Sequence, residues 1–252
     1  MTETLAIVNQ KGGVGKTTTA INLGAALGAL ERRVLIVDCD PQGNATRGLG
    51  VEPTPPHLYH VLVGGAPAAE AVRATGFPNL DLLPAGRDLV GAEVEFVDLE
   101  GWQGRLRDAL APALADYDTV LLDCPPSLGH LTVCALAAAD GVLVPLQCEY
   151  YALEGVSELV STIRRVQSGL NPGLELSGVL LTMYDERTNL SRDVADEIRR
   201  HFAGTVYQTV IPRNVRLAEA PSHGLPILQY DIRCRGAEAY LAAARELLRR
   251  AA

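Results

Sequence analysis

Short apolar runs alternate along the chain with longer segments whose apolar residues recur at helical spacing. We expect the runs to form strands, because near-continuous apolar runs are typical of strands that are buried on both faces. The expected strands are 5–8, 34–37, 80–83, 119–122, 141–146, 176–181 and 205–211, with a helix over 16–30 after the first. This alternation predicts an α/β fold of three layers, in which a mostly parallel twisted sheet carries helices on both faces.

Ligands bind such sheets beyond the carboxyl ends of the strands, so the residues just after each strand are candidate site residues. The second expected strand is followed by Asp38 and the fourth by Asp123. The chain shows no repeat, low-complexity tract or linker, and the proline-rich stretch 51–56 reads as a surface excursion. We therefore expect a single domain over 1–252.

The composition of the 252 residues, 48% hydrophobic and 21% charged, is ordinary for a folded protein and excludes wholesale disorder. No apolar run approaches the ~20 residues of a membrane span, and the N-terminus lacks the basic segment of a secretory signal. The five cysteines are odd in number and form no CxxC pair. We expect reduced thiols in a cytoplasmic protein, not a disulfide framework or a zinc site.

The net charge of −8 is unevenly distributed. Residues 1–160 hold 9 basic and 20 acidic side chains, and residues 161–252 hold 13 and 10. A basic face or ordinary solvated helix faces explain this difference equally well. Only two of the 22 basic residues are lysines, Lys11 and Lys16. An ammonium is a compact point charge that the planar guanidinium of arginine does not replace, so these two positions are candidates for special chemistry.

A glycine-rich loop, Asn9-Gln-Lys-Gly-Gly-Val-Gly-Lys-Thr-Thr18, follows the first expected strand. It nearly fits the phosphate-binding pattern G-x-x-x-x-G-K-[ST], with Gln10 in place of the first glycine. Its glycines let successive N–H groups turn toward one anion, and the helix that follows adds its positive dipole end. Lys16 should reach the β- and γ-phosphates of a nucleotide, and the Thr17 hydroxyl should bind Mg²⁺. A plain turn between strand and helix is the alternative.

The second lysine makes Lys11-Gly-Gly-Val-Gly-Lys-Thr17 resemble the deviant Walker A loop of the ParA/MinD family of P-loop ATPases. Segments 38–46, 121–127, 147–155 and 211–224 are similar to the ParA/Soj chromosome-partition subgroup, so the resemblance covers nearly the whole chain. It implies ATP and Mg²⁺ as cofactors and a homodimer in which Lys11 reaches the partner's nucleotide. The nucleotide-binding residues that it implies are Lys11, Gly12, Gly13, Val14, Gly15, Lys16, Thr17, Thr18, Pro212 and Asn214.

The same resemblance suggests the catalytic roles. Asp123 would hold Mg²⁺ together with Thr17, although a surface acid at a strand end is the alternative. Asp40 would position the attacking water, with Asp38 as the second candidate, while Lys11 and Lys16 neutralise charge. Pro212 and Asn214 would cradle adenine, unless they form an ordinary turn.

For function, the resemblance implies a partition ATPase that drives chromosome or plasmid segregation. The ATP dimer would bind double-stranded DNA without sequence preference, and a ParB-type centromere-binding protein would stimulate slow hydrolysis. Arg187 and Arg216, with Arg213 as a weaker third, are the candidate DNA contacts, because arginine–phosphate contacts need no base code. Solvated or internally paired arginines are the alternative. We expect a cytoplasmic, nucleoid-associated protein with no membrane partner.

Two other functions stay open on the sequence. A MinD-like ATPase would lie on a membrane through a terminal amphipathic helix, and the apolar stripe Tyr240, Leu241, Ala244, Leu247 and Leu248 is followed by Arg249 and Arg250. That stripe lacks a lysine-rich polar face, so we expect it to pack inside the fold. A nitrogenase-reductase-like protein would share an iron–sulfur cluster between subunits, but no cysteine spacing singles out its ligands.

Overall fold

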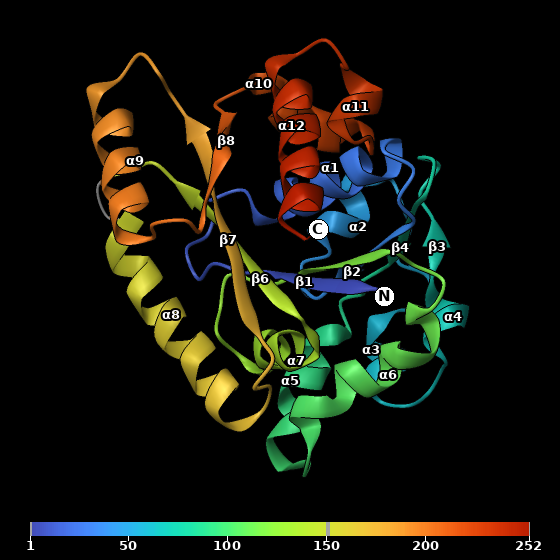
Figure 1. Ribbon diagram of the computed structural model, residues 1–252. Coiled ribbons are helices and arrows are strands. Elements are labelled where there is room, and N and C mark those ends of the chain that lie inside the picture. The colour runs from blue at the N-terminus through green and yellow to red at the C-terminus, as the bar shows by residue number, and fades with distance from the viewer. Residues whose placement is uncertain (1, 150–151, 252) are drawn as a thin grey trace.

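The protein, described by a computed structural model over residues 2–149 and 152–251, is built around one twisted sheet (Figure 1). The eight strands of the sheet lie in the order β3-β4-β2-β5-β1-β6-β7-β8. Their bounds are Glu3–Ile7 (β1), Val34–Asp38 (β2), Arg73–Ala74 (β3), Leu80–Leu83 (β4), Thr119–Asp123 (β5), Gly141–Gln147 (β6), Glu175–Tyr184 (β7) and Val206–Pro212 (β8). All described pairs are parallel except β3 with β4. The expected α/β fold is therefore confirmed.

The seven expected strands are all present, with ends that differ from the prediction by at most three residues. The short edge strand β3 was not predicted, because a two-residue strand leaves no periodic pattern to read. The first strand ends at Ile7, so Val8 lies just outside it instead of within it as expected. Val8 is buried, and its N–H donates to the Leu143 carbonyl at 3.1 Å. The helix expected over 16–30 is α1, Lys16–Ala29.

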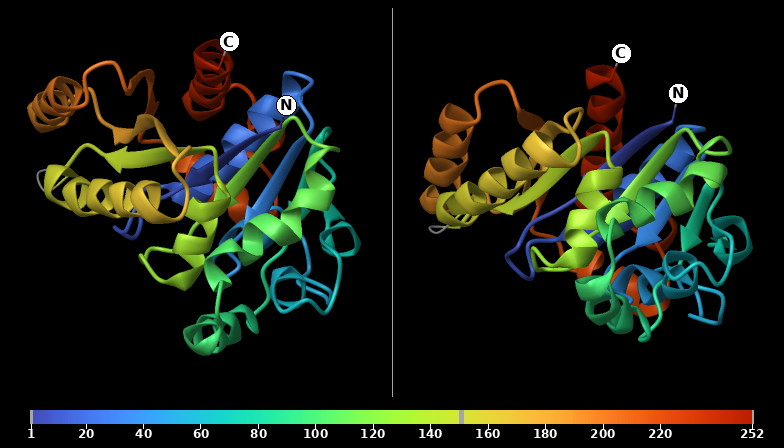
Figure 2. Two further views of the ribbon diagram at one scale, coloured as in Figure 1. Left: turned by 60° about the horizontal axis from the view of Figure 1, so that its bottom comes forward. Right: turned by 90° about the horizontal axis from the view of Figure 1, so that it is seen from below.

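Helices cover both faces of the sheet (Figures 1 and 2). Alternate residues of one strand point to opposite faces, so Leu5 and Ile7 of β1 belong to one apolar core while Ala6 belongs to the other. The Leu5 core includes residues of α1, α2 (Asn44–Gly48), α10 (Val215–Glu219), α11 (Ile227–Tyr230) and α12 (Arg235–Arg250). The Ala6 core includes residues of α3 (Leu58–Leu62), α4 (Ala68–Ala71), α5 (Leu89–Glu95), α6 (Arg105–Leu114), α7 (His130–Ala138), α8 (Ala152–Gly169) and α9 (Asn189–His201).

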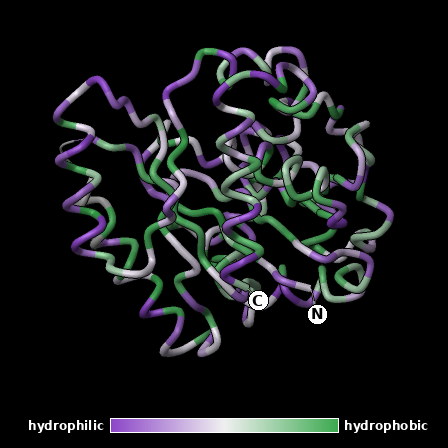
Figure 3. The backbone as a smooth tube through the Cα atoms, turned by 45° about the horizontal axis from the view of Figure 1, so that its top comes forward, coloured by the Kyte–Doolittle hydropathy of each residue, from purple (hydrophilic) through white to green (hydrophobic). Residues whose placement is uncertain are grey.

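The described chain also contains three short 3₁₀ turns, which are η1 (Phe96–Asp98), η2 (Trp102–Gly104) and η3 (Ala220–His223). Figure 3 shows hydrophobic segments concentrated at the centre of the molecule and hydrophilic segments at the outer turns. The stretch 51–56 lies at the surface, as expected.

The terminal helix α12 packs one face against α1 and β8. Tyr240, Ala244 and Leu247 are buried in the core that contains α1. The Tyr240 hydroxyl lies 3.2 Å from the Thr19 hydroxyl of α1, and α12 also contacts β8. Leu241 and Leu248 are partly buried against the same core, so the apolar stripe packs against the rest of the protein. No described helix is both long and apolar enough to cross a membrane.

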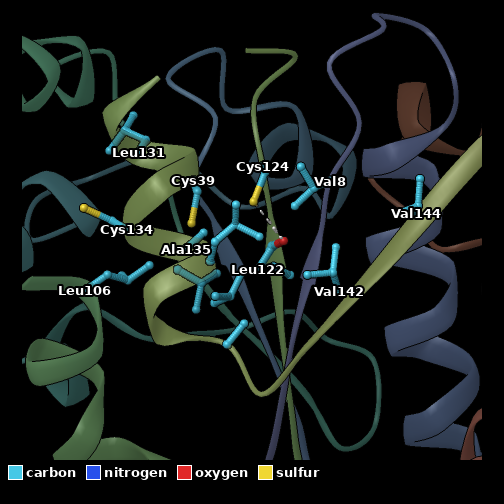
Figure 4. Close-up of a cluster of buried hydrophobic side chains, with 14 of the residues drawn as sticks. Val8, Cys39, Leu106, Leu122, Cys124, Leu131, Cys134, Ala135, Val142 and Val144 are labelled. Atoms are coloured by element: carbon cyan, nitrogen blue, oxygen red, sulfur yellow. Dashed lines mark hydrogen bonds between the residues drawn. The ribbon is translucent and has the colours of Figure 1, made fainter. Parts of the chain in front are cut away.

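The cysteines are free, and four of the five are buried. Figure 4 shows Cys39, Cys124 and Cys134 among apolar side chains of the Ala6 core, near Leu122 and Leu131. Burial raises the pKa of the Cys39 and Cys124 thiols, that of Cys134 to about 12 and that of Cys148 to about 11. Among the described residues, no group of three His, Cys, Asp or Glu side chains is placed to hold a metal ion. The four buried cysteines thus pack as small apolar residues, whereas the Cys234 sulfur accepts a hydrogen bond of 3.4 Å from the Ala237 N–H and caps α12.

Candidate nucleotide site

The glycine-rich loop joins the end of β1 to the start of α1. Gly13 and Gly15 have φ angles of 75° and 91°, in the left-handed region that side chains other than glycine rarely adopt. Val14 between them is fully buried, and its carbonyl accepts a hydrogen bond of 2.8 Å from the Thr182 hydroxyl of β7. The loop is therefore held by the buried Val14 side chain and by the hydrogen bond from β7. Gly15 and Lys16 at the start of α1 line a cavity.

Lys16 opens α1 and is 7% exposed. Its Nζ donates to the Lys11 carbonyl at 3.3 Å, so the ammonium lies over the loop. Burial lowers the pKa of Lys16, and the nearby charges of Asp123 and Asp40 act in the opposite direction. The Lys16 ammonium can exchange this neutral carbonyl acceptor for a phosphate oxygen, because hydrogen bonds between two charged groups are stronger.

Asp123 ends β5, and Asp38 ends β2 directly opposite it in register. Both side chains are fully buried. Asp38 accepts hydrogen bonds from the Thr46 N–H at 2.8 Å, the Thr46 hydroxyl at 2.7 Å and the Asp40 N–H at 3.2 Å. Neither oxygen of Asp123 has a hydrogen-bond partner among the described residues. Asp38 is thus committed to holding the start of α2, while Asp123 is left with two unused oxygens.

The pKa values of both carboxyl groups follow from this burial. Desolvation raises the pKa of Asp123 well above its ordinary value, and the charge of Asp38 raises it further. The Thr17 hydroxyl and the Lys16 ammonium lie close enough to oppose that rise. Desolvation also raises the pKa of Asp38 to about 6, against its three hydrogen bonds. A buried, unpartnered carboxylate beside a hydroxyl offers the hard oxygen donors that Mg²⁺ prefers, so Asp123 and Thr17 fit a magnesium ion.

Asp40 is 6% exposed and belongs to the turn before α2. One of its oxygens accepts a hydrogen bond of 2.9 Å from the Gln42 N–H. Asp40 lines the cavity above the glycine loop, whereas Asp38 does not. Of the two acids that the sequence left open for the water-positioning role, the geometry favours Asp40.

The cavity above the loop has a volume of about 350 Å³. It brings together most of the predicted phosphate-binding residues with residues from four further segments. Its lining is Gly12, Gly13, Gly15, Lys16, Thr17, Thr18, Ile21, Asp40, Asn44, Pro126, Met183 and Pro221. The predicted residues Lys11, Val14 and Asp123 are not in this lining: Val14 and Asp123 are buried beside it, and Lys11 points elsewhere.

A second cavity of about 340 Å³ adjoins the first and shares Gly15, Thr18 and Met183 with it. Predicted residues Pro212 and Asn214 lie in its lining together with apolar side chains of Ile211, Leu217 and Tyr240. The Asn214 oxygen accepts a hydrogen bond of 2.8 Å from the Arg216 N–H and so caps α10. A nucleotide needs an apolar cavity for its flat base beside a second cavity for its phosphates, and the two adjoining cavities have this arrangement.

Sequence reasoning missed Met183 and Thr182. Met183 has a φ of 50°, unusual for a residue with a side chain, and it lines both cavities. Both residues lie near the carboxyl end of β7, at the edge where the other strands carry their site residues. The position after a strand was the available signal, but an apolar run that ends in Thr-Met reads as ordinary core.

Lys11 forms an ion pair with Glu149 of its own chain, with 2.7 Å between Nζ and Oε2. Glu149 follows β6 and belongs to the predicted segment 147–155, of which Tyr150 and Tyr151 lie outside the described residues. The Lys11 N–H donates to the Asn9 side chain at 2.9 Å, and Asn9 in turn donates to the Pro145 carbonyl of β6 at 2.8 Å. Both ends of Lys11 are therefore tied to the β6 side of the loop.

The three candidate DNA-contacting arginines lie at the surface, and two of them are paired with acids. Arg187 is 82% exposed and makes two hydrogen bonds, of 2.9 and 2.7 Å, to Asp185. Arg216 is 53% exposed and pairs with Glu219 at 2.8 Å and Asp231 at 3.6 Å. Arg187 and Arg213 line one open pocket of about 570 Å³ near the ends of β7 and β8, whose lining does not include Arg216.

Comparison with known proteins agrees with this geometry. Residues 2–176 match the model of a family described as AAA domain. The chain is 56% identical to the chromosome partitioning protein ParA of Caulobacter vibrioides over 98% of this chain and 94% of that protein. It is 54% identical to the sporulation initiation inhibitor protein Soj of Bacillus subtilis over 98% of both. The chain belongs to the ParA/Soj family of partition ATPases.

A solved structure shares the fold of this ParA/Soj-family chain. It is named cobyrinic acid a,c-diamide synthase from Mycobacterium smegmatis with bound ATP analog and magnesium. It is 43% identical, with a TM-score of 0.88 over 99% of this chain and 95% of that one. The resemblance predicted from the loop, to the ParA/MinD class and its ParA/Soj subgroup, is therefore confirmed.

Proposed function

We propose that this chain is a partition ATPase that binds Mg²⁺-ATP in the two adjoining cavities and acts as an ATP-dependent dimer. The observation that carries this proposal is Asp123, a fully buried carboxylate with no hydrogen-bond partner beside the loop of Lys16 and Thr17. Leaving such a group unsatisfied costs free energy unless a ligand uses it. The ATP analog and magnesium bound in the 43% identical structure support the same ligand.

Each residue then has a part. The loop N–H groups and Lys16 hold the phosphates, Pro212 and Asn214 flank the base, and Thr17 and Asp123 hold the magnesium ion. The ion supplies neutralisation of the developing phosphate charge. Asp40 orients the attacking water, because it is the acid that faces the cavity. Lys11 completes the site of a partner copy, so that hydrolysis depends on dimerisation.

The proposed partners are double-stranded DNA, without sequence preference, and a ParB-type protein that stimulates hydrolysis. Arg187, Arg213 and Arg216 are exposed enough for phosphate contacts. Exposed ion pairs are worth only ~0.2–1 kcal/mol, so Asp185 and Glu219 compete weakly with a phosphate. One copy offers few contacts, but two copies on one duplex multiply them through effective concentration. The protein would then lie on the nucleoid in the cytoplasm.

The decisive experiment measures DNA retention with ATP, with ADP and without nucleotide, at two salt concentrations and with two unrelated duplexes. ATP-dependent, salt-sensitive retention of both duplexes supports the proposal. Retention without nucleotide, or of one duplex only, contradicts it. Vesicle sedimentation in the same nucleotide states tests the MinD-like alternative, which the packed α12 disfavours.

A further inference from the structure

The Lys11 ammonium cannot pair with Glu149 of its own chain and contact the nucleotide of a partner copy at the same time. The Lys11 side chain forms a 2.7 Å ion pair with Glu149 of the same chain, whereas the proposed dimer needs that ammonium at the partner's nucleotide. The two side chains are 43% and 46% exposed, so the pair is accessible to solvent and can open. This inference rests on the proposed function, because the competing site of Lys11 is the one that the ATP dimer provides.

Glu149 is itself held in position. Its second carboxylate oxygen accepts a hydrogen bond from the Gln147 side chain, and its N–H donates to the Gln147 carbonyl at 2.9 Å. Gln147 is the last residue of β6, a central strand of the sheet. The acid that holds Lys11 is therefore anchored to the rigid part of the fold, and Lys11 is the member of the pair that must move.

The nucleotide site is linked to the same residue. In this structure Lys16 donates to the Lys11 carbonyl at 3.3 Å. A phosphate group is a stronger acceptor than a carbonyl, so its arrival draws the Lys16 ammonium away and removes one contact that restrains the Lys11 backbone. ADP and ATP both supply a β-phosphate for this, but only the dimer offers the Lys11 ammonium a new anionic partner.

We propose that the Lys11–Glu149 ion pair is an autoinhibitory contact that lowers the dimerisation constant of the nucleotide-bound protein. Glu149 acts through Lys11 and is a positioning residue. An exposed ion pair contributes a factor of ~2–5 to an equilibrium. Each dimer must open two such pairs, one per copy, so the effect on the dimerisation constant is the square of the single effect, ~4–25-fold.

The first test measures dimerisation by sedimentation with a non-hydrolysable ATP analog and Mg²⁺. Glu149→Gln preserves the shape and removes the charge, and it should dimerise ~4–25-fold more tightly than wild type. The matched control is Glu158→Gln, because Glu158 is an exposed acid that accepts a 3.0 Å hydrogen bond from Gln10, the neighbour of Lys11. Glu158→Gln should dimerise as wild type does.

A second background separates the ion pair from a general charge effect. In Lys11→Ala protein, studied at high concentration, adding Glu149→Gln should give no gain, since the ammonium that the acid restrains is gone. A gain that persists there overturns the proposal. The single variant Glu149→Gln, in which Lys11 is intact, overturns the proposal as well if it dimerises no more tightly than wild type. Weaker dimerisation of that variant would assign Glu149 to the interface instead.

The chain allows a direct reading of the ion pair, because Lys11 and Lys16 are its only lysines. Amine acetylation followed by mass spectrometry reports both, with the 7% exposed Lys16 as internal reference. Without nucleotide, Lys11 should react ~2–5-fold faster in Glu149→Gln than in wild type or Glu158→Gln. Equal rates show that no ion pair exists in solution. This reading needs no dimer, so failure of wild type to dimerise would contradict the proposed function alone.

Discussion

Asp38 and Asp123 face each other in register at the ends of β2 and β5, yet Asp38 accepts three hydrogen bonds and Asp123 none from the described chain. Burying two carboxylates side by side ordinarily lowers stability, because each loses its hydration and each repels the other. Here the neighbourhood gives them different tasks: Asp38 fixes the turn that carries Asp40, and Asp123 is left for a ligand.

Replacing Asp123 with Asn should make the nucleotide-free protein more stable. The change removes a carboxyl group whose burial disfavours its charged form and whose only nearby hydrogen-bond donor among the described residues is the weakly placed Thr17 hydroxyl, so we expect a gain of about 1–3 kcal/mol at pH 7. Urea denaturation without nucleotide measures it. Magnesium-dependent ATP turnover should fall to background in the same variant. A loss of stability would show that Asp123 is satisfied by contacts within the chain.

The pH dependence of stability has a definite sign at this residue. The folded-state pKa of Asp123 lies above the ordinary value of 3.8, so folding binds a proton that the unfolded chain releases. The stability that this carboxyl contributes is complete below about pH 4 and is lost as the pH rises through its folded-state pKa. Wild type should therefore lose stability relative to Asp123→Asn as the pH rises from 4. A constant difference between the two proteins from pH 4 to 8 contradicts this.

Asp38→Ala should mainly lower stability, whereas Asp40→Ala should mainly abolish turnover. Asp38→Ala leaves three donors without an acceptor in the core and should destabilise the protein by about 2–4 kcal/mol. Asp40→Ala removes one hydrogen bond at the cavity edge and should cost less than about 1 kcal/mol. It should still bind ATP and accumulate as a dimer, but it should not turn over. Denaturation, size-exclusion chromatography and phosphate release distinguish the two; turnover by Asp40→Ala at the wild-type rate would remove its proposed role.

Lys16→Ala should lose ATP affinity by about 100-fold, because charge-assisted hydrogen bonds to phosphate are replaced by nothing. Its side chain makes one hydrogen bond to the described residues, to the Lys11 carbonyl, and that bond is long at 3.3 Å, so the fold should persist. Calorimetric titration measures the affinity. Lys11→Ala is the matched control among the lysines: it should bind ATP with near-normal affinity and dimerise only at concentrations well above those that wild type needs. Equal ATP affinity of wild type and Lys16→Ala would show that the loop does not bind phosphate as proposed.

Arg216→Glu should abolish ATP-dependent DNA retention for any duplex and leave dimerisation unchanged. Each arginine that neutralises a phosphate adds about one unit to the salt dependence, so the milder Arg216→Gln should lower the slope of a dimer by about two units. Arg107→Glu is a close control, since Arg107 is 55% exposed and paired with Asp108, much as Arg216 is 53% exposed and paired with Glu219. Equal loss of retention in both variants would show that net charge, not this surface, governs binding.

The sequence by itself determined the seven longer strands and the glycine loop. Strands that are buried on both faces must be nearly continuous apolar runs, so all seven longer strands could be read from the chain. The loop could be read because its left-handed positions require glycine, as Gly13 and Gly15 show. Both features depend on local chemistry that a run of ten residues contains.

Only the tertiary structure decided which polar side chains are free to act. The sequence left Asp38 and Asp40 as alternatives for the water-positioning role. In the structure, Thr46 of α2 donates two hydrogen bonds to Asp38, which occupy its carboxylate. It did not indicate Met183, whose role comes from β7 lying beside the loop, or the pairing of Lys11 with Glu149, 138 residues away. A residue type limits the hydrogen bonds that a side chain can make, but the partners that use them come from distant parts of the chain, and these meet only when the sheet forms.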